Sequence, residues 1–347
     1  MFIVVPPKPR VGRMRCWRRM SQASPRSKPY RRWRIVACKK QTRAGDRLVG
    51  SNIRPGGISC LVSGALCCVD DVPDALYSIH SPRKELRPFV RRLFAADTRI
   101  AGTLRVRPGP TGYNYLGWYC AGRARIVVDG AARVCTGLHF SGQIQGQEVE
   151  VVYTRTRLVH VLAEFTATGL TRLTHVLGKR IRGSTMPVGE AAPELAKFLP
   201  ARLDGSGASL RARLDAFQHG LAALAESAAP PMDYLDEAVK LIEDEGGQIA
   251  VANVARRLGV SPRQLQRRFN DVVGIGPKYF AKVIQLNVAL GALLNDDQAY
   301  LAALSHDCGY YDQAHFAHVM QEFFRQGPGE FLRSRDRVLA TFLGRSR

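Results

Sequence analysis

The chain has 347 residues, 46% of them hydrophobic, so it is long enough for two domains with buried cores. No apolar run approaches the roughly 20 residues that span a bilayer, and the first ten residues do not form a secretory signal. These features argue against a membrane protein and predict a cytoplasmic one. The formal net charge of +22 suggests nucleic acid as a partner, but its distribution along the chain is uneven.

Residues 1–75 are predicted to be a basic, disordered leader. Residues 1–70 hold 16 Lys and Arg against 2 Asp and Glu, mixed with Pro and Ser, and show no apolar face. Such a segment cannot bury enough surface to offset its ordering entropy. Two interpretations stay open. The leader is either a basic arm that adds nonspecific phosphate contacts, or a segment that the native start site does not include.

Residues 76–200 have the pattern of a β-rich domain, either a small cupin-like barrel or a sandwich. Residues 113–119 alternate and are rich in aromatic side chains, and residues 124–128 lead into a hairpin turn at Asp129-Gly130. Residues 148–153 and 158–165 read as further strands. A small β-rich domain of this kind can enclose a small effector. The candidate ligand-binding residues are Tyr113, Tyr115, Trp118 and Tyr119, which can equally be core residues.

Residues 201–231 are predicted to be a helical linker. Its apolar residues are spaced by four and three, which is a two-heptad seam: Leu210, Leu214, Phe217, Leu221 and Leu224. The seam either packs against the chain's own β domain or forms a short contact in a homodimer.

Residues 232–335 read as helices only, and their first half contains a helix-turn-helix motif. Residues 249–258 form an apolar helix face, and Gly259 can adopt the left-handed conformation that ends such a helix. Ser261 is a predicted N-cap, with Pro262 at the first position of the next helix. An apolar helix, a glycine turn and a capped second helix together indicate this motif.

The second helix of this motif is predicted to read DNA. Leu265 and Phe269 are four residues apart and must face the core, which leaves the side chains between them outward. Arg pairs with guanine and Gln with adenine by bidentate hydrogen bonds in the major groove. The candidate DNA-binding residues of this unit are Ser261, Arg263, Gln266 and Arg267.

The same pattern returns about fifty residues later in the sequence. A helix over residues 300–308 ends at Gly309, Tyr310 and Tyr311 are expected to fill the turn, and Asp312 caps the next helix. Phe316, Met320, Phe323 and Phe324 are predicted to face the core. The outward residues Gln313, His315 and His318 are the DNA-binding candidates of this second unit. A long apolar helix over residues 277–294 joins the two units, and residues 336–347 form a tail.

These stretches resemble the DNA-binding domain of the AraC/XylS family. The matching segments are VANVARRLGVSPRQLQRRF, GIGPKYFAKVIQLNVALGALL and ALSHDCGYYDQAHFAHVMQEFFRQGPGEFLR. The resemblance implies a transcription regulator whose two recognition helices enter successive major grooves of promoter DNA, with RNA polymerase as a further partner if it is an activator. It assigns base contacts to the Arg, Gln and His residues named above. His318 stands where the family commonly has Arg, which suggests a weaker second unit.

Two alternatives remain, a nonspecific nucleic-acid-binding protein that uses its basic arm, and a cupin-like enzyme. A cupin metal site needs two His and a Glu converging on one ion, whereas His139, His160 and His175 are widely separated in sequence. No nucleophile elbow, P-loop or dinucleotide fingerprint occurs. The cysteine spacing matches no zinc module. The sequence therefore predicts no catalytic residues, no cofactor and no metal, and a protein that is not an enzyme.

Overall fold

The computed structural model describes residues 76–203, 209–295, 301–334 and 342. The predictions for the basic leader, and for the C-terminal tail apart from Phe342, lie outside these residues. Among the helices described, none is long and apolar enough to cross a membrane.

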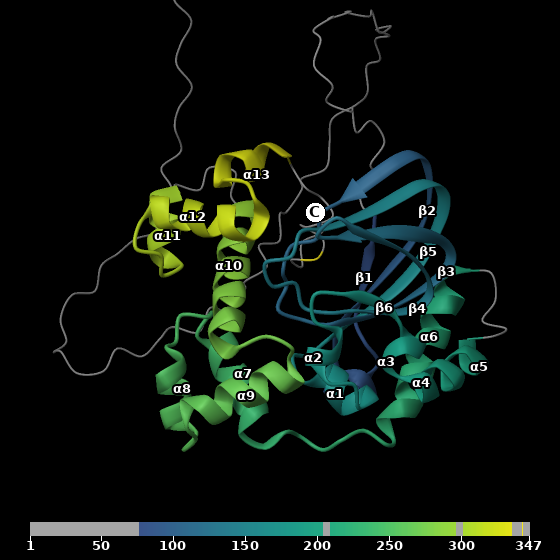
Figure 1. Cartoon of the computed structure of the whole chain (residues 1–347), viewed down its shortest axis with the longest axis horizontal. Coiled ribbons are helices and arrows are strands. Elements are labelled where there is room, and N and C mark those ends of the chain that lie inside the picture. The colour runs from purple at the N-terminus through teal and green to yellow at the C-terminus, as the bar shows by residue number, and fades with distance from the viewer. Residues whose placement is uncertain (1–75, 204–208, 296–300, 335–341, 343–347) are drawn as a thin grey trace, which may run out of the picture. The chain divides into compact units, whose positions relative to one another are not determined.

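The β-rich domain is built on one antiparallel sheet with the strand order β1-β2-β5-β3-β4-β6 (Figure 1). The strands are β1 (Ser78–His80), β2 (Val90–Val106), β3 (Tyr115–Val128), β4 (Ala131–Ser141), β5 (Val149–Phe165) and β6 (Thr185–Pro187). The predicted β-rich fold is confirmed, but the sheet is not a closed barrel, because β1 and β6 lie at its two edges, each paired with one neighbour. The two strands predicted within residues 148–165 are parts of the single strand β5.

The hairpin between β3 and β4 turns where the sequence predicts it. Asp129 and Gly130 have φ values of 48° and 83°. Two successive residues with positive φ match the twist of the flanking strands, which explains why Asp-Gly occupies this position. The Asp129 carboxylate also accepts a hydrogen bond from the backbone N–H of Glu148, at 2.8 Å.

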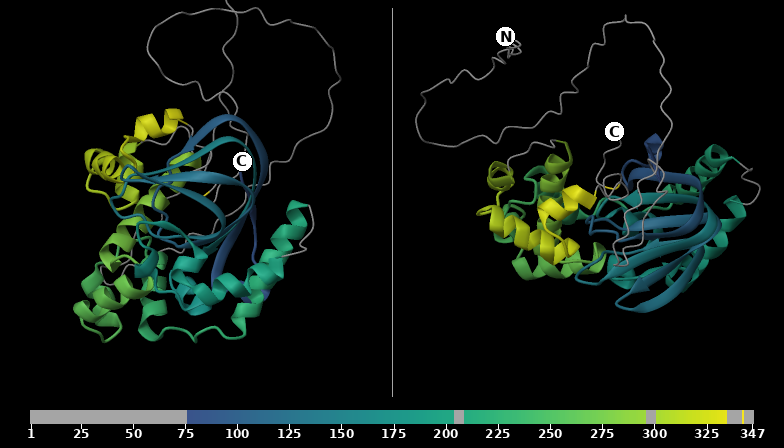
Figure 2. Two further views of the ribbon diagram at one scale, coloured as in Figure 1. Left: turned by 45° about the vertical axis from the view of Figure 1, so that its right-hand side comes forward. Right: turned by 90° about the horizontal axis from the view of Figure 1, so that it is seen from above.

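One face of the sheet is covered by short helices and by α6, as Figure 2 shows. The helical elements here are a 3-10 turn (Lys84–Leu86), α1 (Gly169–Thr174), α2 (Gly178–Ile181), α3 (Val188–Ala191), α4 (Pro193–Phe198), α5 (Pro200–Leu203) and α6 (Leu210–Ala225). Leu214, Phe217 and Leu221 of α6 are buried in the core that this layer forms with the sheet. The predicted seam thus packs against the chain's own β domain, which is one of the two arrangements that the sequence left open; the other was a contact in a homodimer.

The C-terminal region is helical, as predicted. It consists of α7 (Asp233–Asp244), α8 (Val251–Arg257), α9 (Pro262–Val272), α10 (Pro277–Asn295), α11 (Leu301–Asp307), α12 (Gln313–Phe324) and α13 (Pro328–Ser334). One core joins α7, α8, α9 and the first half of α10, around Phe269 and Phe280. A second core joins the later part of α10 to α11, α12 and α13, around Leu290 and Phe316. Helix α10 therefore links two helical units, each with its own core.

Candidate DNA-binding surface and ligand cavity

The start of α9 is fixed by a capping box. The Ser261 hydroxyl accepts from the backbone N–H of Gln264 at 3.2 Å, and the Gln264 side chain accepts from the backbone N–H of Ser261 at 3.0 Å. This pair satisfies two backbone donors that a helix start otherwise leaves free. The predicted N-cap is therefore present, and the Ser261 hydroxyl already has a structural partner.

Helix α9 has one buried face and one exposed face. Leu265 and Phe269 are fully buried, whereas Arg263, Gln266 and Arg267 are exposed, as the periodicity predicts. Arg268, which was not among the candidates, is exposed as well. Within the described part of the chain, no carboxylate forms an ion pair with these three arginines, and Asp271 at the helix end is bound by Lys179 at 2.8 Å. The exposed face of α9 therefore presents three uncompensated guanidinium groups.

Gln266 does not project straight outward from α9. A Cβ atom added at Gly276 would lie 2.4 Å from Gln266 Nε2, so the side-chain amide lies over the glycine that follows α9.

The second helix-turn-helix unit is capped as predicted but carries less charge. Asp312 accepts from the backbone N–H of His315 at 2.7 Å, and the His315 ring accepts at Nδ1 from the backbone N–H of Tyr311 at 3.3 Å. Gln313, His315 and His318 are all exposed. Because His315 Nδ1 is an acceptor, its Nε2 carries the proton that can be donated outward.

One prediction for this turn is wrong. Tyr310 is buried and packs on Phe316 with ring centres 5.0 Å apart, but Tyr311 is 89% exposed. Gly309 has φ of 78°, which turns the chain so sharply that the backbone N–H of Tyr310 reaches Ser305 O at 2.9 Å. The turn holds a single apolar side chain, and the next residue points to solvent.

Two contacts link the second unit to the rest of the helical region. Gln285 of α10 donates from Nε2 to the Cys308 carbonyl at 2.8 Å. A Cβ atom at Gly309 would lie 2.5 Å from Gln248 Oε1, so Gln248, which precedes α8, lies directly against the second turn. Among the residues that the structure describes, no group of three His, Cys, Asp or Glu side chains is placed to hold a metal ion.

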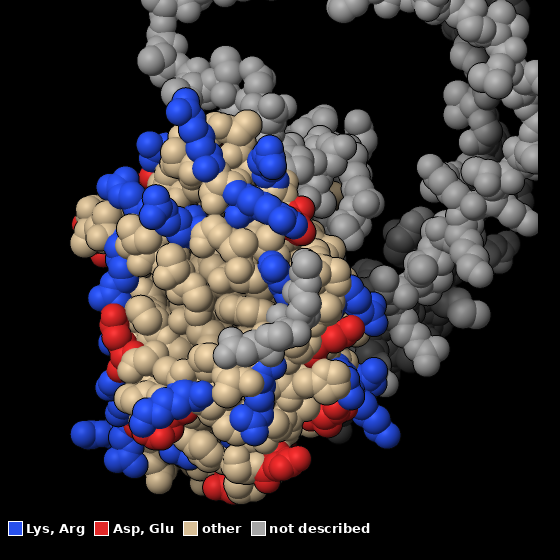
Figure 3. Space-filling view, turned by 90° about the vertical axis from the view of Figure 1, so that its right-hand side faces the viewer, with Lys and Arg blue, Asp and Glu red and all other residues tan. Residues whose placement is uncertain are grey.

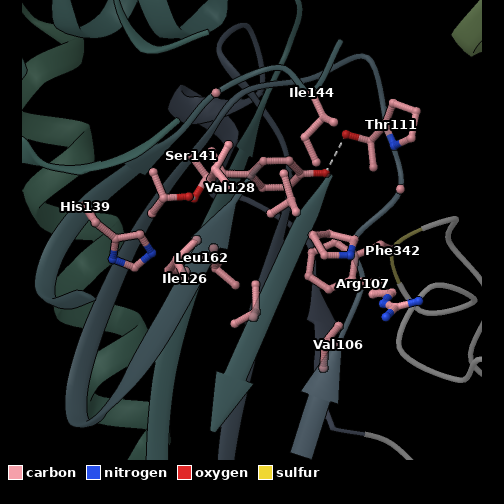
Figure 4. A pocket seen from close by; sticks show the side chains of 18 of the residues that line it. Val106, Arg107, Thr111, Ile126, Val128, His139, Ser141, Ile144, Leu162 and Phe342 are labelled. Atoms are coloured by element: carbon pink, nitrogen blue, oxygen red, sulfur yellow. Dashed lines mark hydrogen bonds between the residues drawn. The ribbon is translucent and has the colours of Figure 1, made fainter. Parts of the chain in front are cut away.

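The face of the sheet opposite α6 contains a cavity of about 140 Å³. Figure 4 shows Ile126, Val128 and Leu162 pointing into it, with His139 on one side and Phe342 on the other. Most of the lining is apolar, and the polar groups are few. They come from Tyr77, Tyr115, Tyr119, Tyr153, His139, His160, Ser141, Gln143 and the loop between β2 and β3. A mainly apolar cavity with a few polar groups is typical of a small-molecule site.

Three of the four predicted ligand-binding residues line this cavity. They are Tyr113, Tyr115 and Tyr119, whereas Trp118 packs into the core on the opposite face of the sheet. Side chains alternate along a strand, so Tyr115 and Tyr119 share one face of β3 and Trp118 takes the other. Tyr113 precedes the strand, and its hydroxyl donates to Glu243 of α7 at 2.7 Å.

The cavity also contains a buried pair of histidines that the sequence did not reveal. His139 of β4 and His160 of β5 both stack against Tyr119 of β3, with ring centres 4.7 and 3.9 Å from it and 5.2 Å from each other. Gly117 gives them room, since a Cβ atom there would lie 2.4 Å from His139 Nε2. Burial lowers the pKa of His139 to about 4 and that of His160 well below its usual value, so both rings are neutral near pH 7.

The loop between β2 and β3 lies between the cavity and the helical region. Its residues 107–111 line the cavity. The Thr111 carbonyl accepts from Asn287 of α10 at 3.0 Å, and Asn114 at the start of β3 donates to the Val273 carbonyl at 3.1 Å. Val273 directly follows α9. A change in the cavity wall can therefore reach both α10 and the end of α9 through direct contacts.

The sheet side of the molecule is not a continuous basic surface. Figure 3 shows that Lys and Arg side chains on this face are interspersed with Asp and Glu around a broad uncharged area. Elsewhere in the β domain, Arg157 pairs with Asp97 and Arg133 with Glu190, and each pair offsets one positive charge.

Comparison with known proteins gives one family match and several structural ones. Residues 254–334 match the family described as a helix-turn-helix domain. Among curated proteins, none matches the sequence of this chain.

The solved structures that it resembles include ToxT from Vibrio cholerae, at 8% identity and a TM-score of 0.40, covering 70% of this chain and 98% of that one. The C-terminal domain of AraT, a response regulator from Geobacillus stearothermophilus, is 23% identical with a TM-score of 0.29, over 30% of this chain and 87% of the other. The AraC-like transcriptional activator CuxR is 15% identical with a TM-score of 0.21, over 61% of this chain and 86% of the other.

Proposed function

We propose that the chain is a sequence-specific regulator of transcription of the AraC type whose principal recognition helix is α9; the match of residues 254–334 to the helix-turn-helix domain family supports this. Arg263, Gln266 and Arg267 are its base-reading residues. Double-stranded promoter DNA is the partner, and a cytoplasmic location follows from that role.

The exposed face of α9 is the observation that carries this proposal. The helix is held by a buried apolar face and a capping box, so its outward side chains are presented on a rigid element. Arg263 and Arg267 are one helical turn apart and have no carboxylate partner among the described residues. An unpaired guanidinium can make the bidentate contact with the edge of guanine in the major groove.

In this proposal α12 is the weaker of the two recognition helices. Its outward residues Gln313, His315 and His318 bring polar hydrogen-bonding groups but no fixed positive charge. Phosphate and guanine contacts by cationic side chains supply much of the affinity of DNA-binding proteins. We therefore assign α12 to positioning the domain in a second groove, with a smaller share of the specificity.

The β domain has a regulatory role in the same proposal. A small effector in the cavity changes DNA binding through the loop between β2 and β3, whose residues touch both the cavity and α10. If the protein is an activator, RNA polymerase is a further partner, and a homodimer would place two domains on one promoter. The proposal assigns no surface of this chain to RNA polymerase or to a second copy of the chain.

The test is the affinity of the full-length protein and its variants for a DNA site selected by the wild type. Arg263→Ala and Arg267→Ala should each lose roughly 1–3 kcal/mol of binding free energy on that site. The loss should be concentrated at particular base pairs, and binding to unrelated DNA should change little. Arg125→Ala, an exposed arginine on β3, is the matched control and should behave as the wild type. Equal losses on selected and unrelated DNA would show that these residues contact only phosphates.

A further inference from the structure

The side chain of Phe342, near the C-terminal end of the sequence, lies in the mouth of the cavity of the β domain. Its ring stacks on Phe94 with centres 4.5 Å apart and an angle of 27° between the planes. Tyr77 and Tyr115 approach the same ring edge-on, with centres 5.6 and 6.0 Å away. Three aromatic residues from β2, β3 and the segment before β1 thus contact one phenyl ring.

The backbone of Phe342 is held as well as its ring. Arg92 of β2 donates from Nη2 to the Phe342 carbonyl oxygen at 2.7 Å. The residue therefore engages the β domain through two different groups, a flat aromatic ring and an oxygen acceptor, which are separated by only a few bonds.

The groups that receive Phe342 are fixed independently of it. Arg92 forms two hydrogen bonds to the fully buried Glu164, at 2.7 and 3.0 Å, which set the direction of its guanidinium. The Tyr115 hydroxyl donates to the same carboxylate at 2.7 Å, and Phe94 is fully buried. Preorganised groups of this kind lose little freedom on binding, so the subsite has the properties of a ligand-binding site.

We propose that Phe342 occupies the recognition subsite of the effector cavity, and that the effector belongs to the class of aromatic acids. Such a compound carries a flat aromatic ring a few bonds from a carboxylate, and it binds in competition with Phe342. The inference rests on the proposed function, because it takes the cavity as the effector site, and it adds the ligand class and the internal competitor.

Two further donors inside the cavity fit an acceptor-rich ligand. Gln143 Nε2 and His160 Nε2 are buried, and neither has a hydrogen-bond partner among the described residues. The Tyr77 hydroxyl lies 2.7 Å from the other ring nitrogen of His160, so donation by the phenol leaves the proton of the neutral imidazole on Nε2. Buried donors without partners are costly, and ligand oxygens can satisfy them.

The size of the cavity supports competition rather than joint occupancy. With Phe342 in its lining, the cavity measures about 140 Å³. That is close to the roughly 150 Å³ of an engineered apolar cavity that accepts benzene, and well below the usual 300–1,000 Å³ of ligand pockets. An aromatic acid whose carboxylate reaches Arg92 must take the place of Phe342.

The experiment is titration calorimetry of the full-length protein with 3-phenylpropanoate as the probe. Removal of the competitor in Phe342→Ala should tighten binding about tenfold or more, as expected if the segment occupies the subsite at least about nine-tenths of the time. Phe198→Ala is the matched control, since Phe198 lies on α4 under Arg202, outside the cavity. This control should bind as the wild type does.

Two further arms test the ligand class. In the Phe342→Ala background, 3-cyclohexylpropanoate and octanoate should each bind several-fold more weakly than 3-phenylpropanoate, since neither can stack on Phe94 as a flat ring. Arg92→Lys in that background should weaken binding of the acid but not of propylbenzene, which lacks the carboxylate. The propylbenzene titration also shows that this variant retains its folded cavity.

Three results would each overturn a different part of this inference. Equal affinity of wild type and Phe342→Ala would overturn the internal competitor, and tighter binding of octanoate would overturn the aromatic class. No binding of 3-phenylpropanoate to Phe342→Ala would overturn the whole inference. DNA affinity, measured on the same samples, decides the proposed function independently, because the α9 variants and the cavity variants alter different parts of the chain.

Discussion

At the scale of single residues, the buried histidines of the cavity make the stability of the protein depend on pH. The pKa of His139 in the folded protein is about 4, below the value near 6.5 of an unfolded chain, and the cause is burial. Between these two values the unfolded state binds more protons than the folded state. Stability is therefore fully present above about pH 6.5 and is lost as the pH falls toward 4.

His139→Gln tests this dependence. At about pH 5 the wild type should have lost roughly 2 kcal/mol of unfolding free energy through His139 alone, and the variant should be spared that loss. Urea unfolding near pH 7.5 and pH 5 measures the difference. The exposed residue His318 supplies the control, since His318→Gln should lose as much stability on acidification as the wild type. An identical pH dependence in all three proteins would contradict the burial of a neutral His139.

At the scale of elements, the start of α9, the proposed recognition helix, depends on its cap. The Ser261 hydroxyl and the Gln264 side chain satisfy two backbone donors at the start of α9. Ser261→Ala should lower the unfolding free energy by roughly 0.5–2 kcal/mol, whereas Ser261→Thr should keep most of it. Thermal or urea unfolding in the absence of DNA checks this. Unchanged stability of the alanine variant would mean that Ser261 matters only for DNA contact.

The elements also show what the sequence can and cannot predict. Leu265, Phe269 and the cap at Ser261 were predicted because helix periodicity and capping are local properties. The sequence does not predict on which face of β3 the side chain of Trp118 lies. An aromatic-rich strand has two faces, and the residue pattern does not show which face meets the cavity. The sequence also predicts Tyr311 in the turn, because two adjacent tyrosines give no sign of which one is buried.

Other features depend on contacts between distant segments. The stack of His139, Tyr119 and His160 requires the pairing of three strands in one register. The contact of Phe342 with Phe94 joins residues about 250 positions apart. A pattern of residue types along the chain contains no information about such pairings, so neither the histidine pair nor the occupied subsite was predicted.

At the scale of the whole molecule, most of the net charge lies in a different segment from the proposed recognition helix. Residues 1–70 carry a net charge of +14, while residues 232–347 carry equal numbers of basic and acidic side chains. The three unpaired arginines of α9 nevertheless form a local basic face within that neutral region. In the proposed function, the choice of sequence belongs to α9, and the basic residues of the leader would add affinity for any DNA.

Selection of binding sites from a random pool of DNA duplexes tests this claim most directly. It is carried out with the full-length protein, with a chain lacking residues 1–70, and with Arg267→Ala. The account predicts that the shortened chain selects the same sequence motif with a weaker dependence on salt, while Arg267→Ala loses the base preference at one or two adjacent positions. A motif that survives in Arg267→Ala but disappears without residues 1–70 would contradict it.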